Sequence, residues 1–372
     1  MDNEEEFKAR RLAALRDCDR VLCSGRPKSM RERLAPLTAY DGLDAPADFY
    51  GDGVVAELER RVAELLGTKG AAFFPTGTMA QQVALRCWAG RTGNPTVALH
   101  PLAHPETHER SALSTLTGLR TVHPTTEQRL PDADEIHDFD EPFGTLMLEL
   151  PLRDAGFILP TWDGLTATVA AARERDAVVH FDGARLWECP PHFGHSLPEI
   201  AALADSVYVS FYKSLEGISG AALGGPADFI AEAKAWRHRY GGLLFQQWPA
   251  VLSALHGLDH ELPRLPEYVA HAKVVAAALG GALRGSVPYF RVNPETPYTH
   301  QFQVWLAASA EALNEAGVRQ AEETKTAVFG KWFDVGGAPG LAMTEVTVAA
   351  SALEWTPEDV AIGVADFLTY LG

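Results

Sequence analysis

The chain has 372 residues, of which 47% are hydrophobic and 22% are charged, and its formal net charge is −17. This composition is typical of a globular protein with a large core. So acidic a chain does not attract nucleic acid or an anionic membrane electrostatically. The N-terminal segment lacks the apolar stretch of a signal peptide, and no run of about 18 apolar residues occurs. We therefore expect a cytoplasmic protein that acts on small molecules.

The chain contains few cysteines, and their spacing is irregular. A zinc site needs paired ligands at characteristic spacings, which this arrangement does not offer. We therefore expect reduced thiols and no metal. The four residues are Cys18, Cys23, Cys87 and Cys189.

The first predicted elements are helical. Residues 1–45 form a mixed-charge helical arm with a basic segment at 26–37. Apolar residues then recur at helical spacing over residues 54–66, and Gly67 marks the end of that helix. A short apolar run, AAFFP, leads into the turn and helix of TGTMAQQVALRCWAG.

Strand and helix patterns alternate through the middle of the chain. Buried strands are expected at TVALH, GTLMLEL, AVVHFD and SVYVSF, with helical patterns such as LTATVAAARERD between them. This alternation predicts an α/β fold with a mainly parallel sheet. Near residue 250 the pattern changes to Ala- and Leu-rich helices followed by strands and a final helix. We expect a large α/β domain over residues 46–255 and a small α+β domain over 256–372.

Three motifs in this order could carry chemistry, and the first is Thr76-Gly77-Thr78. A glycine between two hydroxyl residues lets backbone N–H groups approach an anion, and the following helix adds the positive end of its dipole. The motif therefore predicts a phosphate site, although such turns are also ordinary packing features.

The second motif is Asp182, which the apolar run AVVHFD places at the carboxyl end of a strand, where α/β sheets build their sites. A carboxylate in such surroundings needs a cationic or protonated partner. A pyridinium nitrogen would serve. The alternative is that Asp182 caps the next turn or pairs with Arg185.

The third motif is Lys213, which follows the strand SVYVSF. A desolvated lysine favours the neutral amine and so attack on a carbonyl. The alternative is a lysine whose side chain extends from the strand end to solvent.

The order and spacing of these motifs are those of fold-type I pyridoxal-phosphate (PLP) enzymes. The segment VAELERRVAELLGTKGAAFFPTGTMAQQVAL resembles the threonine aldolase segment that contains an "SGTM" phosphate loop. HFDGARLWE is similar to the "HxDGAR" block of that family, SFYKSLEG to its lysine block, and HPLAHPETHERSALSTLTG to the segment whose His lies over the cofactor ring. The chain thus resembles the threonine aldolase and β-eliminating lyase family over residues 48–250, and more loosely beyond.

This resemblance implies a role for each matching residue. Gly77 and Thr78, next to Thr76, would hold the phosphate, and Asp182 would pair with the ring nitrogen. Lys213 would form the Schiff base. The remaining matches are His104, which would stack on the ring and is a base candidate beside ordered water, and Arg185, which would lie near the phenolic oxygen or the substrate carboxylate. Glu109 and Gly118 match family positions after His104, whereas His100 and His108 lie close enough to be confused with it.

The sequence departs from the family pattern in four places. No "SDT" segment occurs in residues 1–50, and the "GGGMRQ" loop reads GGLLFQ, so that Phe245 replaces an arginine. The "ENTH" block reads ELPLRD at residues 149–154, and residues 341–351 lack the usual carboxylate-binding arginine. A cation elsewhere would have to replace that arginine. The candidates are Arg153, Arg185, Arg237 and Arg239.

The resemblance implies a PLP-dependent lyase that cleaves the Cα–Cβ bond of a β-hydroxy-α-amino acid and works as a homodimer or homotetramer. β-Elimination or racemisation of an amino acid is the alternative, since the missing carboxylate clamp decides which bond breaks. A non-catalytic PLP-fold subunit is a third reading. Because apolar groups replace polar ones, we expect a bulkier or less polar substrate than threonine.

Overall fold

The computed structural model describes residues 2–371. Leu34–Leu265 form one compact unit, and the segments up to Arg33 and from Pro266 form the other. The N-terminal segment thus belongs with the C-terminal part of the chain. The predicted division at 45/46 and 255/256 stays a prediction.

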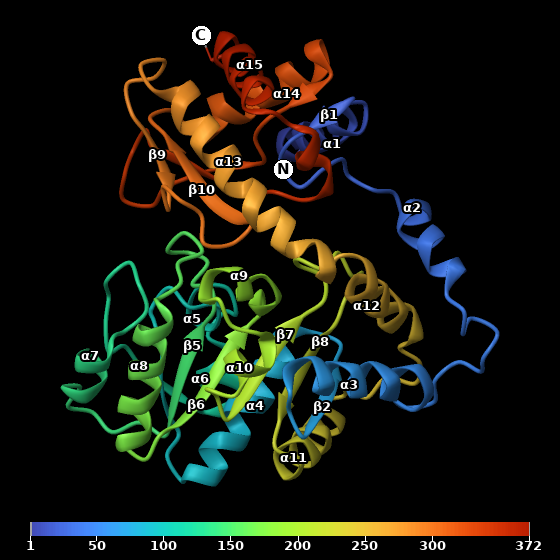
Figure 1. Ribbon diagram of the computed structural model, residues 1–372, viewed down its shortest axis with the longest axis vertical. Coiled ribbons are helices and arrows are strands. Elements are labelled where there is room, and N and C mark those ends of the chain that lie inside the picture. Colours follow the sequence, from blue (N-terminus) through green and yellow to red (C-terminus); the bar gives the residue numbers. More distant parts are fainter. Residues whose placement is uncertain (1, 372) are drawn as a thin grey trace. The chain divides into compact units, whose positions relative to one another are not determined.

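The unit Leu34–Leu265 is built on a seven-stranded sheet with the order β2-β8-β7-β6-β5-β3-β4 (Figure 1). All its strands run parallel to their neighbours except β8, which is antiparallel to β2 and β7. The strands are β2 (Gly70–Phe74), β3 (Thr96–Ala98), β4 (Arg120–Val122), β5 (Thr145–Glu149), β6 (Val178–Gly183), β7 (Ser206–Ser210) and β8 (Ala221–Gly225). The mainly parallel sheet predicted from the alternating pattern is confirmed.

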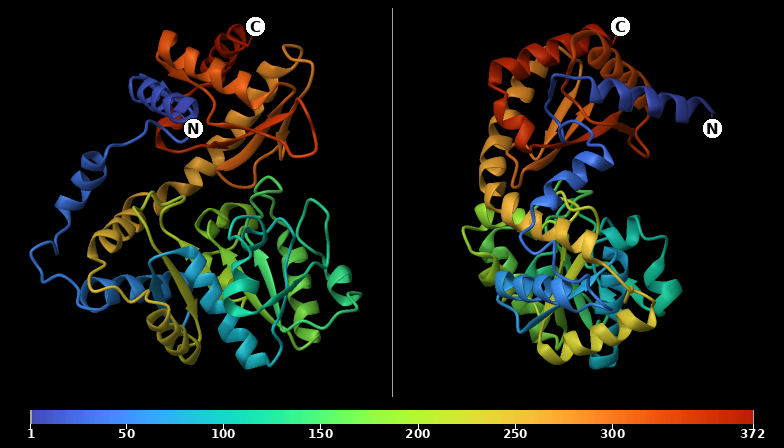
Figure 2. Two further views of the ribbon diagram at one scale, coloured as in Figure 1. Left: turned by 180° about the vertical axis from the view of Figure 1, so that it is seen from behind. Right: turned by 90° about the vertical axis from the view of Figure 1, so that its right-hand side faces the viewer.

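Helices cover both faces of this sheet (Figure 2). One core joins α4 and α11 to β2, β7 and β8. On the opposite face, Gly224 of β8 lies against Leu66 of α3. The helices of this unit are α3 (Gly53–Leu66), α4 (Gly77–Thr92), α5 (His104–Thr107), α6 (Ala112–Thr117), α7 (Ala133–His137), α8 (Trp162–Glu174), α9 (Pro190–Phe193), α10 (Leu197–Ala201), α11 (Ala227–Arg239) and α12 (Trp248–His260), with 3-10 turns η1 (Ala35–Ala39), η2 (Leu186–Glu188) and η3 (Leu262–Arg264). A short helix, α2 (Met30–Leu34), includes the point between Arg33 and Leu34 where the chain passes from one unit to the other.

Local sequence explains why these elements end where they do. Helix α3 ends at Gly67, which adopts the left-handed conformation (φ 66°) that glycine reaches without steric cost. β5, β6 and β7 are buried along their lengths, so their apolar residues pack against helices on both faces. Polar side chains are therefore concentrated where these strands end.

The other unit contains a four-stranded antiparallel sheet with the order β12-β13-β10-β9 and a two-stranded parallel pair, β1-β11. In its core, α13, α14 and α15 pack against the four-stranded sheet. Its elements are α1 (Asp2–Arg16), β1 (Arg20–Val21), α13 (Leu265–Leu283), β9 (Phe290–Asn293), β10 (Gln301–Leu306), α14 (Ala310–Thr324), β11 (Thr326–Ala327), β12 (Trp332–Asp334), β13 (Ala342–Thr347), η4 (Ala350–Glu354) and α15 (Pro357–Thr369).

The N-terminal arm differs in part from the helical prediction. α1 ends at Arg16, and Arg20–Val21 form strand β1, which pairs with Thr326–Ala327. Strand pairing over such a sequence separation is decided by tertiary contacts rather than by local propensity. No helix among residues 2–371 is long and apolar enough to cross a membrane.

Candidate active site

The carboxyl ends of the parallel strands β5, β6 and β7 lie at one edge of the sheet (Figure 1). β5 ends at Glu149, which stands directly beside Asp182 of β6 in the parallel register. Asp182 in turn stands beside Tyr208 of β7, and the chain turns after β7 to reach Lys213. Parallel α/β sheets build their ligand sites at this edge.

Asp182 is a buried carboxylate that makes no ion pair with any residue in 2–371. It is 2% exposed, and its Oδ1 accepts a hydrogen bond of 3.1 Å from the backbone N–H of Ala184. Burial raises the pKa of Asp182, although the charges of His104 and Lys213 partly oppose this rise. Of the predicted alternatives, the cap of the next turn forms through this Ala184 hydrogen bond, whereas an ion pair with Arg185 does not form among the described residues.

Glu149 is a second buried carboxylate at this edge, and the sequence reasoning assigned it no role. Its two oxygens accept the backbone N–H groups of His104 at 2.7 Å and Arg153 at 3.2 Å. Burial and the neighbouring charge of Asp182 raise the pKa of Glu149 to about 7. Its position at the end of the apolar run GTLMLEL, as for Asp182, is the signal that could have found it.

Lys213 lies in the turn after β7 and is half-buried, with its Nζ 5.5 Å from the ring centre of Tyr212. Burial and the charge of Arg185 lower the pKa of Lys213 to about 8, against the opposing charge of Asp182. A substantial fraction of this amine is therefore neutral near physiological pH. That is the form that attacks a carbonyl.

Thr76, Gly77 and Thr78 form the turn between β2 and α4. The Thr76 hydroxyl accepts the backbone N–H of Met79 at 3.2 Å and so caps the helix. A Cβ atom on Gly77 would lie 2.1 Å from the Tyr208 hydroxyl, so close packing requires glycine here. The amides of the first turn of a 16-residue helix are thus presented beside β7.

His104 begins the short helix α5. Its Nδ1 lies 3.3 Å from a carboxylate oxygen of Glu109, whose other oxygen accepts from Gln82 at 3.2 Å. Burial lowers the pKa of His104, but the Glu109 contact and the charge of Asp182 outweigh it, so that the net shift is upward. The predicted His104 and Glu109 therefore form a pair at this site.

His100 takes part in a structural hydrogen-bond network, so it is not a second candidate for the histidine over the cofactor ring. Its Nδ1 accepts the backbone N–H of Leu102 at 3.0 Å, so its Nε2 carries the proton and donates to the carbonyl of Glu127 at 2.6 Å. Burial lowers the pKa of His100 and keeps it neutral in this arrangement. Both ring nitrogens of His100 therefore already have hydrogen-bond partners.

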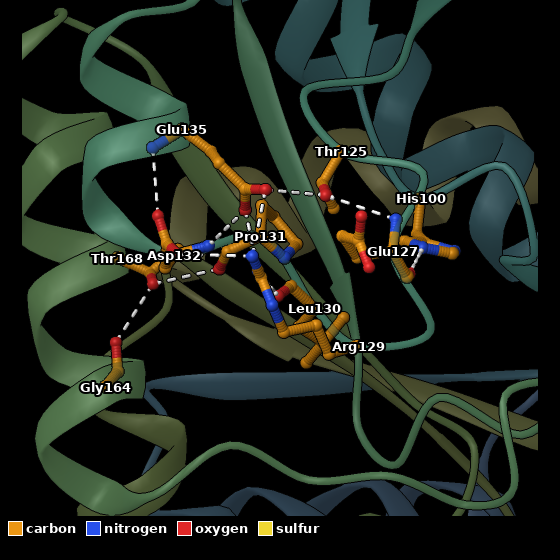
Figure 3. Close-up of polar contacts among 10 residues, drawn as sticks. All are labelled: His100, Thr125, Glu127, Arg129, Leu130, Pro131, Asp132, Glu135, Gly164 and Thr168. Carbon is orange, nitrogen blue, oxygen red and sulfur yellow. Dashed lines mark hydrogen bonds and ion pairs between the residues drawn. The ribbon is translucent and has the colours of Figure 1, made fainter.

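The network continues through the loop that His100 binds, as Figure 3 shows. The central residue is Glu135, whose carboxylate accepts from Thr125 at 2.7 Å and from Arg129 at 2.7 and 3.0 Å. Asp132 and Glu135 also form a capping box at the start of α7. These contacts tie residues 125–135 together, and the His100–Glu127 contact joins them to the segment that leads to α5.

The four arginines proposed as a replacement clamp have different positions. Arg237 is buried and donates to Glu59 at 3.0 Å and to the carbonyl of Phe73 at 2.6 Å, so it has a structural role. Arg239 is exposed and stacks on Trp236. Arg185 and Arg153 remain, because the charges of both lower the pKa of Lys213.

Arg185 is buried, and its guanidinium carbon lies 5.3 Å from the ring centre of Phe157. Its Nε has no hydrogen-bond partner among the described residues. The Nε of Arg237 also lacks such a partner, so Arg185 is distinguished instead by its charge, which lowers the pKa of Lys213.

A series of buried hydrogen bonds from side chains of α4 and β7 holds β6 at His180, two residues before Asp182. Trp88 donates to the Ser206 hydroxyl at 2.7 Å, and His180 lies 2.7 Å from both Ser206 and the side-chain oxygen of Gln81. Burial lowers the pKa of His180 to about 3, so the ring is neutral. Since the Gln81 oxygen can only accept, Nε2 of His180 carries the proton and Nδ1 accepts from Ser206.

Replacing Ser206 with alanine is expected to destabilise the cofactor-free protein. Trp88 and His180 would each lose a buried partner, at a cost of about 1–3 kcal/mol for each group. Urea unfolding measures the effect, with the exposed Ser114→Ala as the matched control. Equal unfolding midpoints for the two variants would contradict this account of the hydrogen bonds.

The fold and this sheet edge together define the class of protein. A mainly parallel sheet that carries an aspartate and a lysine at neighbouring strand ends, beside a capped helix N-terminus, is the arrangement of fold-type I PLP enzymes. The model of the family described as "Beta-eliminating lyase" matches residues 26–307. The chain therefore belongs to this family.

Known structures and relatives agree with this membership. A structure from Exiguobacterium, provisionally described as an aromatic amino acid beta-eliminating lyase/threonine aldolase, is 33% identical with a TM-score of 0.89, covering 97% of this chain and 99% of that one. One from Listeria monocytogenes, provisionally described as an L-allo-threonine aldolase, is 33% identical with a TM-score of 0.88, covering 98% and 99%. The low-specificity L-threonine aldolase of Candida albicans is 31% identical over 58% of this chain. The chain spans 61% of that relative's length, less than two thirds.

Proposed function

We propose that this protein is a PLP-dependent carbon–carbon lyase that cleaves a β-hydroxy-α-amino acid into glycine and an aldehyde. The observation that carries the proposal is the pair of Asp182 and Lys213 at one sheet edge. Asp182 is buried and makes no ion pair within the described part of the chain, and Lys213 has a pKa lowered to about 8. Membership of the beta-eliminating lyase family and the likeness to threonine aldolases support it.

The residues present fit PLP. The buried carboxylate of Asp182, which has no ion-pair partner among residues 2–371, matches a protonated ring nitrogen, and the partly neutral amine of Lys213 matches the aldehyde. The first turn of α4, with Gly77 and Thr78, offers amides for a phosphate. Bound PLP would supply an electron sink for the electron pair of the broken bond.

The protein's own side chains would bind this cofactor and fix its orientation. Lys213 would hold it covalently, and Asp182 would keep its ring nitrogen protonated. The Glu109 contact fixes the orientation of the His104 ring, which would lie over the cofactor ring. Arg185, with its buried Nε, would donate to the phenolic oxygen or to the substrate carboxylate.

A panel of β-hydroxy amino acids, mixed with the purified protein and PLP, tests the reaction type. Glycine and an aldehyde are the expected products. Pyruvate or another 2-keto acid would instead mean β-elimination, and a change in optical rotation alone would mean racemisation. A protein that binds no PLP and turns over no substrate would be a non-catalytic subunit.

The panel also tests the predicted substrate preference. Phe245 forms edge-on contacts with Phe49 and Tyr50, at ring-centre distances of 5.4 and 5.5 Å. Because Phe245 stands where the family loop has an arginine, we expect faster turnover of phenylserine than of threonine, and a clear preference for threonine would contradict that expectation.

A homodimer or homotetramer is part of the same proposal. Phe49, Tyr50 and Phe245 are 60%, 49% and 54% exposed, and adjoining exposed aromatic rings are typical of an interface. Light scattering of the purified protein distinguishes these assemblies from a monomer. We also propose a cytoplasmic location for this acidic protein.

A further inference from the structure

A second histidine, His108, lies beside His104 and belongs to a cluster that the family resemblance does not use. Its Nε2 is 2.8 Å from Oδ2 of Asp154 and 3.3 Å from Nη1 of Arg153. The His108 ring centre is 5.2 Å from that of His104. The side chain is 41% exposed, so a small molecule can reach it.

The contact with Asp154 decides which nitrogen of His108 carries the proton. A carboxylate oxygen can only accept, so the shorter contact of 2.8 Å makes Nε2 of His108 the donor to Asp154, and Arg153, which can only donate, then makes no hydrogen bond to that nitrogen at 3.3 Å. In the neutral ring the lone pair then lies on Nδ1, which is the proton-accepting atom. Arg153 also lies 3.4 Å from Oδ1 of Asp154 and so holds this carboxylate from its other side.

His104 is less suited to accept a proton. Its Nδ1 lies 3.3 Å from the buried Glu109, and its pKa is raised, which favours the protonated ring. An imidazolium has no lone pair with which to accept a proton. The two neighbouring rings therefore fit different tasks: His104 fits a fixed ring over the cofactor, and His108 fits a base.

The site is close to Lys213 and Asp182. The charges of both residues act on His104, and the charge of Arg153 acts on Lys213. His108 is placed at this edge by its 5.2 Å ring distance to His104, and we infer that the β-substituent of a substrate held at Lys213 extends toward it. Among the "ENTH" positions the chain has Leu152 in place of the histidine, so a base at this place must come from another segment.

We propose that His108, oriented by Asp154, is the general base that takes the proton of the substrate's β-hydroxyl group. This inference rests on the proposed function. In the step, the β-hydroxyl proton passes to Nδ1 of His108, the β-oxygen forms the aldehyde C=O, and the Cα–Cβ bond breaks. Its electron pair stays on Cα, which then gains a proton to give glycine, while His108 returns its proton to solvent. Asp154 and Arg153 are positioning residues.

The test compares two reactions of the PLP-loaded enzyme. Cleavage of phenylserine or threonine needs the β-hydroxyl proton removed, whereas exchange of the glycine α-proton in D2O does not. His108→Asn is expected to lower kcat for cleavage by about 100- to 10,000-fold, which is the usual effect of losing a general base. The glycine exchange rate and the visible absorbance of the bound cofactor should stay at their wild-type values.

Matched variants separate the catalytic role from a structural one. Asp154→Asn should lower kcat for cleavage in the same direction and leave glycine exchange intact. His123→Asn is the control, because His123 lies 3.6 Å from Glu106 and outside the cluster. Both reactions should be unchanged in this control.

Nitrogen NMR of the cofactor-free protein gives a readout that does not depend on activity. With 15N-labelled histidine, His108 should show a protonated Nε2 and an unprotonated Nδ1 in its neutral form. Asp154→Asn should change this tautomer balance.

Each outcome decides the inference. Loss of cleavage with retained exchange supports it. Equal cleavage by wild type and His108→Asn overturns it, and so does loss of both reactions, which would indicate a role in holding the cofactor. If the wild-type enzyme cleaves no β-hydroxy amino acid, the proposed function fails first, and the inference fails with it.

Discussion

Replacing Lys213 with alanine is expected to abolish both cleavage activity and the visible absorbance of covalently held PLP. Lys213 is the amine at this sheet edge whose pKa is lowered, to about 8, by burial and by Arg185. No other group would then attach the cofactor, so turnover should fall to the background of the assay. The exposed Lys69→Ala is the matched control and should behave as wild type.

The lowered pKa also sets the pH dependence of cofactor uptake. Only the neutral amine attacks an aldehyde, so the rate of PLP uptake by the cofactor-free protein should rise with pH. Half of the maximal rate is expected near pH 8, the pKa of Lys213 in the folded protein, rather than near its ordinary value of 10.5. Stopped-flow absorbance measures the profile. A midpoint near the ordinary value, or an absorbance band that survives in Lys213→Ala, would contradict the assignment.

Replacing Asp182 with asparagine is expected to have opposite effects on activity and on stability. In the loaded enzyme the substitution breaks a buried ion pair, which costs about 3–5 kcal/mol. If that free energy is lost from the transition state, kcat/KM falls by about two to four orders of magnitude. Steady-state kinetics with a β-hydroxy amino acid measures this loss.

In the cofactor-free protein the same substitution should stabilise the fold at neutral pH. Burial raises the pKa of Asp182 above its ordinary value of 3.8, so the folded state binds more protons than the unfolded state above pH 3.8. Stability from this group is therefore present at low pH and is lost as pH rises. Asparagine cannot ionise, so the melting temperature at neutral pH should rise by roughly a few degrees.

The control for this prediction is the exposed Asp140→Asn, which should change neither property. The stability gain should shrink as the pH is lowered toward 3.8, because wild-type Asp182 then becomes protonated too. A destabilised Asp182→Asn in the absence of cofactor would mean that the carboxylate has a structural partner besides the Ala184 N–H group, one that asparagine cannot bind. That result would contradict its proposed role.

Much of the fold could be predicted because its signals are local. The runs AVVHFD and SVYVSF are too apolar for a solvated face and too short for a typical helix, so they indicate buried strands. Asp182 ends the first run, and Lys213 follows the second after Tyr212. The strands are β6 and β7; Asp182 lies near the carboxyl end of β6 as predicted, whereas β7 ends at Ser210 and Lys213 lies in the turn that follows.

The arginines show where such reasoning stops. Arg237 and Arg153 are equal candidates in the sequence, yet Arg237 is buried against Glu59 and a backbone carbonyl, while the charge of Arg153 acts on Lys213. A side chain's partner depends on segments that are distant in sequence. Glu59 is 178 positions from Arg237.

The sequence by itself determined the class of fold, the family and the pair of Asp182 and Lys213, because hydrophobic periodicity and short motifs are properties of neighbouring residues. Only the tertiary structure decided that β8 runs antiparallel, that Glu149 stands beside Asp182, and that His108 meets Asp154. These facts depend on strand register and loop packing, which are set by contacts between segments far apart in the chain.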